Sequence, residues 1–214
     1  MKSPGLLALL AATIIVGAAF VAALLAVSRP GASPSASGPP PGPYKGSEPP
    51  GEIRAPAFAL RDYRGRPVSM RAQRGKVVVL SFVDSKCTEK CPIVTSVIAQ
   101  TYRRLAPALR RQVVPILLSV SPKVDTPRSV RRFLADRHAL ALTYLLGTPR
   151  RLRPVWKAYG IVSAFETGNA DVHSSDVRVF DRRGVWVSTQ HAGIDLSPGN
   201  LDHDVLTALK RSRR

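Results

Sequence analysis

Cysteine is scarce in this chain of 214 residues, which has only Cys87 and Cys91. A closed structural zinc site uses four ligands, and no further cysteine or convincing histidine stands near the pair in the sequence, so we do not expect one. A disulfide between the two would close a short loop, and the chain-entropy estimate gives it only about 2 kcal/mol of stabilisation. Because neither cysteine lies near the N-terminus, a lipid-modified cysteine there is excluded.

Acidic residues are also few, since 14 aspartates and glutamates stand against 32 lysines and arginines, for a net charge of +18. Such a basic chain suggests nucleic acid as a partner. However, the basic residues are scattered as pairs such as Arg103-Arg104, Arg131-Arg132 and Arg182-Arg183, without interleaved aromatic residues. We therefore expect no nucleic-acid binding, and a solvated basic surface that attracts acidic lipids or acidic proteins.

Charge is absent from one long apolar stretch near the N-terminus, Leu6–Val27. Its 22 residues would form a helix of about 33 Å, enough to cross a bilayer. The apolar region of a cleaved signal peptide is normally shorter. We therefore expect a retained membrane anchor over residues 1–27, with a signal segment as the alternative.

The composition divides the rest of the chain in two. Residues 28–56 are rich in proline, glycine and serine, which is typical of a linker. Residues 57–214 have the length of one ordinary domain. A dithiol outside the cytoplasm usually has a redox or metal role, so we expect a single-pass protein of the cell membrane whose domain lies on the extracytoplasmic side.

The domain shows alternating strand and helix patterns. A hairpin is expected around the turn at Arg64-Gly65, and the apolar run 76–83 reads as a central strand buried on both faces. Pro92 is expected at the first position of the helix that follows. Further elements are expected as a helix to about 105, strands at 113–120 and 142–146, helices at 127–137 and 149–159, a hairpin at 176–189 and a last helix at 200–210. This order indicates a thioredoxin-like α/β domain with a central sheet flanked by helices.

The two cysteines lie between the central strand and the start of this helix. Unpaired N–H groups at a helix start stabilise a thiolate, and Lys86 and Lys90 add positive charge nearby. The pattern therefore indicates a functional dithiol. Thiol-disulfide exchange is one reading, whereas a thiol peroxidase is a weaker one because it needs activating groups that the sequence does not supply.

Several short motifs share an order and spacing found in one family. They are Ala55-Pro56-Ala57-Phe58, Gly75-Lys76, the Cys-x-x-x-Cys-Pro motif at 87–92, Ser119-Val120-Ser121-Pro122, Asp125-Thr126-Pro127, Tyr159-Gly160-Ile161 and Asp171-Val172-His173-Ser174. In these motifs the chain resembles the Sco/SenC family of membrane-tethered thioredoxin-fold proteins that deliver copper to cytochrome c oxidase. The resemblance covers most of the domain.

The resemblance implies a copper site made by Cys87, Cys91 and His173. Two thiolates and an imidazole suit Cu(I), and the nitrogen ligand also allows Cu(II). The implied partners are the oxidase subunit that carries the Cu-A site, and other copper chaperones or thiol-disulfide oxidoreductases. We expect a metallochaperone that needs no catalytic turnover; the alternative is an extracytoplasmic thiol-disulfide oxidoreductase with Cys87 and Cys91 as its redox pair. Asp84 and Asp171 are candidates for tuning the site or orienting a ligand.

Overall fold

The computed structural model describes residues 42–211. The expected anchor over residues 1–27 and the first part of the expected linker lie outside these residues. Within the described part, no helix is long and apolar enough to cross a membrane.

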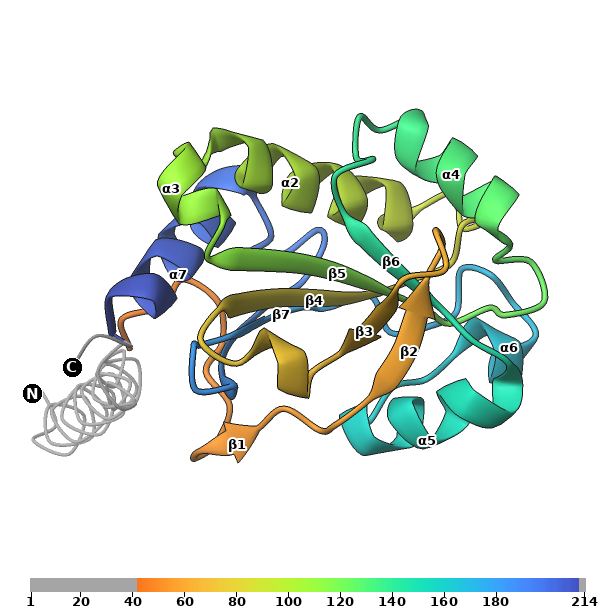
Figure 1. The fold of residues 1–214 in the computed structure, drawn as a ribbon, viewed down its shortest axis with the longest axis horizontal. Helices are drawn as coiled ribbons and strands as arrows, with labels where there is room; N and C mark the ends of the chain where they lie inside the picture. The colour runs from red at the N-terminus through yellow and green to blue at the C-terminus, as the bar shows by residue number, and fades with distance from the viewer. Residues whose placement is uncertain (1–41, 212–214) are drawn as a thin grey trace, which may run out of the picture. The chain divides into compact units, whose positions relative to one another are not determined.

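The described residues form a mixed sheet of eight strands in the order β1-β8-β7-β4-β5-β6-β2-β3 (Figure 1). At its centre, β4 pairs in parallel with β5 and β5 with β6, while β7 runs antiparallel to β4. Strand β2 pairs antiparallel with both β6 and β3. The strands are β1 (Ile53–Arg54), β2 (Ala59–Asp62), β3 (Pro67–Ser69), β4 (Val77–Val83), β5 (Val113–Ser119), β6 (Thr143–Leu146), β7 (Val177–Phe180) and β8 (Val185–Gln190).

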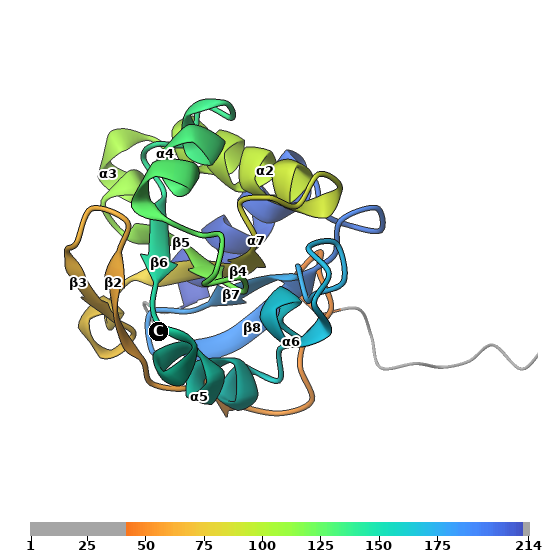
Figure 2. The ribbon, with the colours of Figure 1, turned by 90° about the vertical axis from the view of Figure 1, so that its right-hand side faces the viewer.

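Helices cover both faces of the sheet (Figure 2). Helices α2, α4 and α7 pack on one face, and α5 and α6 on the other. The helices are α2 (Lys90–Arg104), α3 (Pro107–Arg110), α4 (Pro127–Ala135), α5 (Pro149–Tyr159), α6 (Ala164–Thr167) and α7 (Pro198–Arg211), with a short 3-10 helix η1 (Arg71–Gln73). The expected α/β architecture, a central sheet flanked by helices, is confirmed.

Every residue of β4 is buried. Val77 and Val79 pack with the α2 and α7 side, whereas Val78 and Leu80 pack with the α5 side. An uninterrupted apolar sequence is what a strand covered on both faces requires. The central strand is therefore correctly predicted, and it fixes where the cysteine loop leaves the sheet.

Most other expected elements are present, with shifted ends. Helix α2 begins at Lys90, so Pro92 lies inside its first turn rather than at its first position. Proline is tolerated there because the first four N–H groups of a helix have no partner within it. Helix α4 ends at Ala135, earlier than expected, and Thr126 caps its start by accepting a hydrogen bond from the Ser129 N–H. The short elements β1, η1, α3 and α6 were not expected.

The last part of the expected linker is attached to the domain. Ser47 pairs with Thr189 beside β8, and Tyr44 is buried. The Asp204 carboxylate on α7 accepts hydrogen bonds from the N–H groups of Lys45 and Gly46 at 2.6 and 3.0 Å. It also accepts from two β8 side chains, those of Ser188 and Gln190. The buried Asp204 thus joins the entering chain, β8 and α7.

Replacing Asp204 tests this attachment. Burial alone would raise the pKa of Asp204, but its hydrogen bonds hold the pKa below the ordinary value. Its stabilising effect is then present above the ordinary aspartate pKa of about 3.9 and is lost as the pH falls through the lower folded-state value. Asp204→Asn should reduce the free energy of unfolding at neutral pH by about 1–3 kcal/mol and should flatten its fall below about pH 4.

Denaturant unfolding at several pH values measures both effects. The matched control is Asp136→Asn at an exposed position, which should change the free energy of unfolding little. An Asp204 variant as stable as this control would contradict the assigned attachment.

Candidate metal centre

The two cysteines lie at the carboxyl end of β4, one in the loop and one in the helix. Cys87 precedes α2 and Cys91 lies in its first turn, where the backbone N–H has no helical partner. This N–H donates to the Cys87 sulfur at 3.5 Å. The helix start therefore stabilises charge on the Cys87 sulfur, as the sequence suggested.

His173 comes from the loop between α6 and β7. The N–H of its neighbour Ser174 donates to the Val162 carbonyl at 2.9 Å, and the Val162 N–H donates to the Ser174 hydroxyl at 3.1 Å. On the other side, the Thr88 N–H donates to Asp171 Oδ1 at 3.3 Å. These contacts hold the histidine loop against the segment between α5 and α6 and against the cysteine loop.

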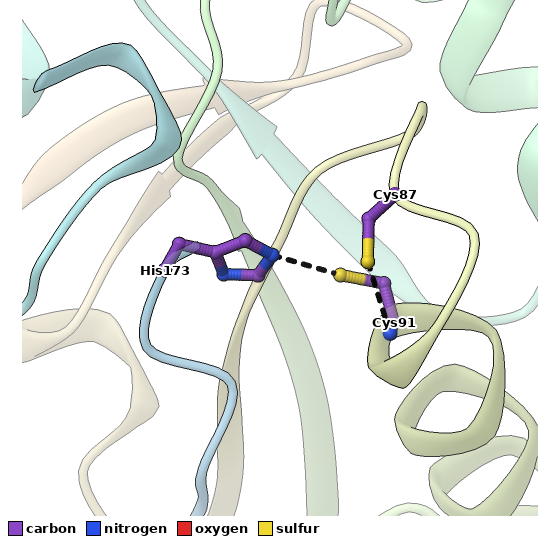
Figure 3. A group of neighbouring side chains, drawn as sticks. All are labelled: Cys87, Cys91 and His173. Carbon is purple, nitrogen blue, oxygen red and sulfur yellow. Dashed lines mark hydrogen bonds between the residues drawn. The ribbon is translucent and has the colours of Figure 1, made fainter. Parts of the chain in front are cut away.

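The structure brings the three expected ligands together (Figure 3). Their ligand atoms all lie within 4.8 Å of one another, and His173 Nε2 is 3.2 Å from Cys91 Sγ. His173 Nδ1 lies 2.7 Å from the Ser174 carbonyl oxygen. Since a carbonyl only accepts, Nδ1 carries a proton, and Nε2 is the nitrogen directed at the sulfurs.

The loop between β4 and α2, which carries Cys87, is hydrogen-bonded to the buried carboxyl group of Asp125. Asp125 Oδ1 accepts the Ser85 N–H at 2.9 Å, and Oδ2 accepts the hydroxyls of Ser119 and Tyr144 at 2.5 and 2.9 Å. Burial raises the pKa of Asp125 despite these hydrogen bonds. The sequence indicated only helix capping for Asp125-Thr126-Pro127; the role of Asp125 beneath the site was missed, because its partners come from three separate segments.

The two thiols are electrostatically unequal. A hydrogen bond from the Cys91 thiol, opposed by burial and supported by His173 and by backbone N–H groups, lowers the pKa of Cys87 to about 3. The same hydrogen bond, together with burial, raises the pKa of Cys91. Burial alone would lower the pKa of His173, but its interactions with Cys87 and Ser174 raise it. Cys87 is therefore the thiolate and Cys91 the thiol that supports it, with the His173 ring beside them.

The donor set fits copper. Two sulfurs and one imidazole nitrogen are soft to intermediate ligands, the set that suits Cu(I). Within residues 42–211, no other cluster of histidine, cysteine and acidic side chains is placed to hold an ion in this way. Metal binding would replace the proton of the Cys91 thiol and requires His173 Nε2 without a proton, since the ligands must be deprotonated.

A model of the SCO1/SenC family matches residues 47–200, which is more than half of the chain. The chain belongs to the SCO1/SenC family. The mitochondrial protein SCO2 of Saccharomyces cerevisiae is 29% identical over 104 residues, which cover 49% of this chain and 34% of that protein. The chain thus spans about a third of the length of this SCO1/SenC relative.

Solved SCO1/SenC structures share the fold. The apo Sco1 protein of Thermus thermophilus matches with a TM-score of 0.65 at 23% identity, covering 78% of this chain and 97% of the other. Copper-bound ScoI of Bradyrhizobium japonicum matches with a TM-score of 0.62 at 24% identity, covering 73% and 100%. The expected thioredoxin-like architecture is therefore confirmed.

The other candidate residues of this SCO1/SenC domain lie outside the cluster of three ligands. Buried Asp84 accepts the Lys86 N–H at 2.6 Å and shapes the loop, and burial raises its pKa. Asp171 links the histidine and cysteine loops, as described above. His191 and His203 are partly exposed and contact Asp195 and Asp204 respectively, and His138 lies beyond the end of α4. None of these three histidines joins the cysteine pair.

The low pKa of Cys87 can be tested in the reduced, metal-free protein. With a pKa of about 3, Cys87 should remain a thiolate from neutral pH down to about pH 4 and lose its charge only below that. A pH titration followed by thiolate ultraviolet absorbance should show one thiolate over this range. Cys87→Ser should abolish the signal, whereas Cys91→Ser should keep it with a higher midpoint; an unchanged signal in Cys87→Ser would refute the assignment.

Proposed function

We propose that this protein is a copper-binding metallochaperone that serves the assembly of cytochrome c oxidase. The observation that carries the proposal is the convergence of Cys87 Sγ, Cys91 Sγ and His173 Nε2 within 4.8 Å. The names of relatives agree, since one solved structure is of a Sco protein with copper bound and another is of a member of the Sco family of cytochrome c oxidase assembly proteins.

Copper is the cargo in this proposal, so the site must release it as well as bind it. Three protein ligands leave copper able to accept another ligand from a partner. Cys87 stands on a loop, whereas Cys91 is fixed in α2. We expect a partner's ligand to join the ion first, and the loop cysteine to leave first as its sulfur regains hydrogen bonds from backbone N–H groups.

Attachment to a membrane is part of the proposal. It rests on the apolar stretch Leu6–Val27 and on an extracytoplasmic place for the dithiol. The partners are then an oxidase subunit with a Cu-A site, and the copper chaperones or thiol-disulfide oxidoreductases that load or reduce this protein. The Cu-A subunit is the proposed recipient because the resemblance in the site motifs points to it.

Anaerobic titration with Cu(I) tests the copper site. The reduced protein should bind one ion tightly through three ligands, and His173→Ala should weaken binding by at least about 10- to 100-fold, because loss of even an outer-shell partner of a metal ligand costs that much affinity. A competing chelator of known affinity measures the change.

His191→Ala is the matched control, because His191 is also a partly exposed histidine but lies outside the cluster. It should bind Cu(I) like the natural protein. Equal binding by the His173 and His191 variants would remove His173 from the site, and no binding by the reduced natural protein would refute the copper proposal.

Thiol-disulfide exchange is a second candidate, which the unequal thiols favour. The Cys87 thiolate would attack a partner disulfide and expel one partner sulfur as a thiolate. The Cys91 thiol would then lose its proton and attack Cys87, so that the second partner sulfur leaves. The partner gains two electrons, and this protein ends with a Cys87–Cys91 disulfide, which can no longer supply two thiolate ligands.

Single cysteine variants test this second candidate. After reaction with oxidised glutathione, Cys91→Ser should accumulate a mixed disulfide at Cys87, because the resolving sulfur is gone. Cys87→Ser should accumulate much less, since Cys91 is fully buried and its pKa is raised. Mass spectrometry measures both adducts, and equal labelling of the two variants would contradict the assigned roles.

A further inference from the structure

Charged side chains are distributed unequally between the two ends of the central strands. The copper site lies at the carboxyl ends of β4 and β5, where acidic and basic residues are mixed. The opposite ends of these strands lie on the other side of the domain. That side holds the starts of β4 and β5 and, because β7 runs antiparallel to β4, the end of β7. The basic residues next to these strand ends are Arg74, Lys76, Arg110, Arg111, Arg182 and Arg183. We call this side of the domain the basic edge.

A pocket lies on the basic edge. It is formed where residues 54–57, η1 and the turn between β7 and β8 meet, and it encloses about 150 Å³. Met70 and Val78 form part of its buried floor. Its charged lining consists of one acidic residue, the buried Asp181, and five basic ones: Arg54, Arg71, Arg74, Lys76 and Arg183. Since liquid water takes about 30 Å³ per molecule, the pocket has room for a phosphate group.

Only part of this positive charge is neutralised. Arg54 pairs with exposed Glu52 at 2.8 Å, and Arg183 pairs with buried Asp181 at 3.0 Å. Within the described chain, no acidic group forms a salt bridge with Arg71, Arg74 or Lys76, and all three are exposed. Three uncompensated cations around one hollow favour an anion there.

The chain enters the domain at the same edge. Tyr44 packs against Arg211 at the end of α7, and both residues line a second pocket that includes Asp181 and Arg183. The sequence places 14 residues between the end of the expected anchor at Val27 and Gly42. A flexible chain of that length has a mean end-to-end distance of about 20 Å, so an anchor would keep this edge close to the bilayer.

We propose that the basic pocket binds the phosphate of an anionic phospholipid headgroup. The lipid is favoured over free phosphate and over an acidic protein because the pocket adjoins Tyr44, near the start of the described chain, and each basic residue near an anionic leaflet adds to the attraction. Docking in this way turns the copper site, at the other edge of the sheet, away from the bilayer. The proposal rests on the expected anchor but needs no copper, so it can fail or hold independently of the copper proposal.

Hydrogen exchange of the full chain in lipid nanodiscs tests the lipid site. Discs of phosphatidylcholine are compared with discs that also contain phosphatidylglycerol, and inorganic phosphate is added to the neutral discs as a separate arm. Amides of residues 71–76 should exchange more slowly in the anionic discs, on the order of tenfold, while those of β4 should not change.

Two triple variants carry the same loss of charge. Arg71→Gln with Arg74→Gln and Lys76→Gln should abolish the slowing, whereas Arg128→Gln with Arg131→Gln and Arg132→Gln, exposed on α4, should keep it. If both variants lost the slowing of exchange, the attraction to the lipid would be a diffuse effect of net charge, and the proposal of a specific site in the pocket would be overturned. No slowing in anionic discs would overturn the proposal, and equal slowing by inorganic phosphate in neutral discs would overturn the choice of a lipid.

Discussion

The burial of Asp125 is the constraint on which the arrangement of the site depends. Asp125 lies in the loop between β5 and α4, and its carboxyl group accepts hydrogen bonds from the Ser85 N–H and from the hydroxyls of Ser119 and Tyr144. Leaving a buried carboxylate without partners is costly, so the loop after β4 must pass where the Ser85 N–H meets it. This fixes the path from β4 to α2, and with it the height at which Cys87 and Cys91 stand above the sheet.

The same constraint explains why the thiols differ. With the loop held down, the unpaired N–H of Cys91 points at the Cys87 sulfur, and the Cys91 thiol is buried beneath it. The Cys87 sulfur accepts hydrogen bonds and becomes the thiolate. The Cys91 sulfur is buried next to it, where a second negative charge is disfavoured. A copper ion bound to both sulfurs would offset the repulsion between two thiolate charges, and a disulfide would remove both charges. Copper binding and thiol exchange are thus two chemical outcomes of one unequal pair.

How much the sequence could predict depended on the range of the interactions. The apolar run of β4, the hairpin at Asp181–Gly184 and the start of α4 at Thr126-Pro127 are set by neighbouring residues, and all were found. His173 stands 82 positions after Cys91 and was identified only through the family resemblance. Asp125 and the Ser174 carbonyl escaped prediction because their roles exist only after folding. The attachment of Lys45 and Gly46 was hidden by a composition typical of linkers, since it uses backbone N–H groups.

The position of Asp204 connects the two edges of the domain. Because it binds the entering chain beside Ser188 and Gln190, near the carboxyl end of β8, the chain first crosses α7 and then returns along β8 to β1. The entry point is thereby held at the end of α7, opposite the loop of Cys87. In the proposed lipid contact, the cations of the basic edge would meet the anionic surface, and the Cys87 loop at the opposite end of β4 would stay accessible to a protein partner.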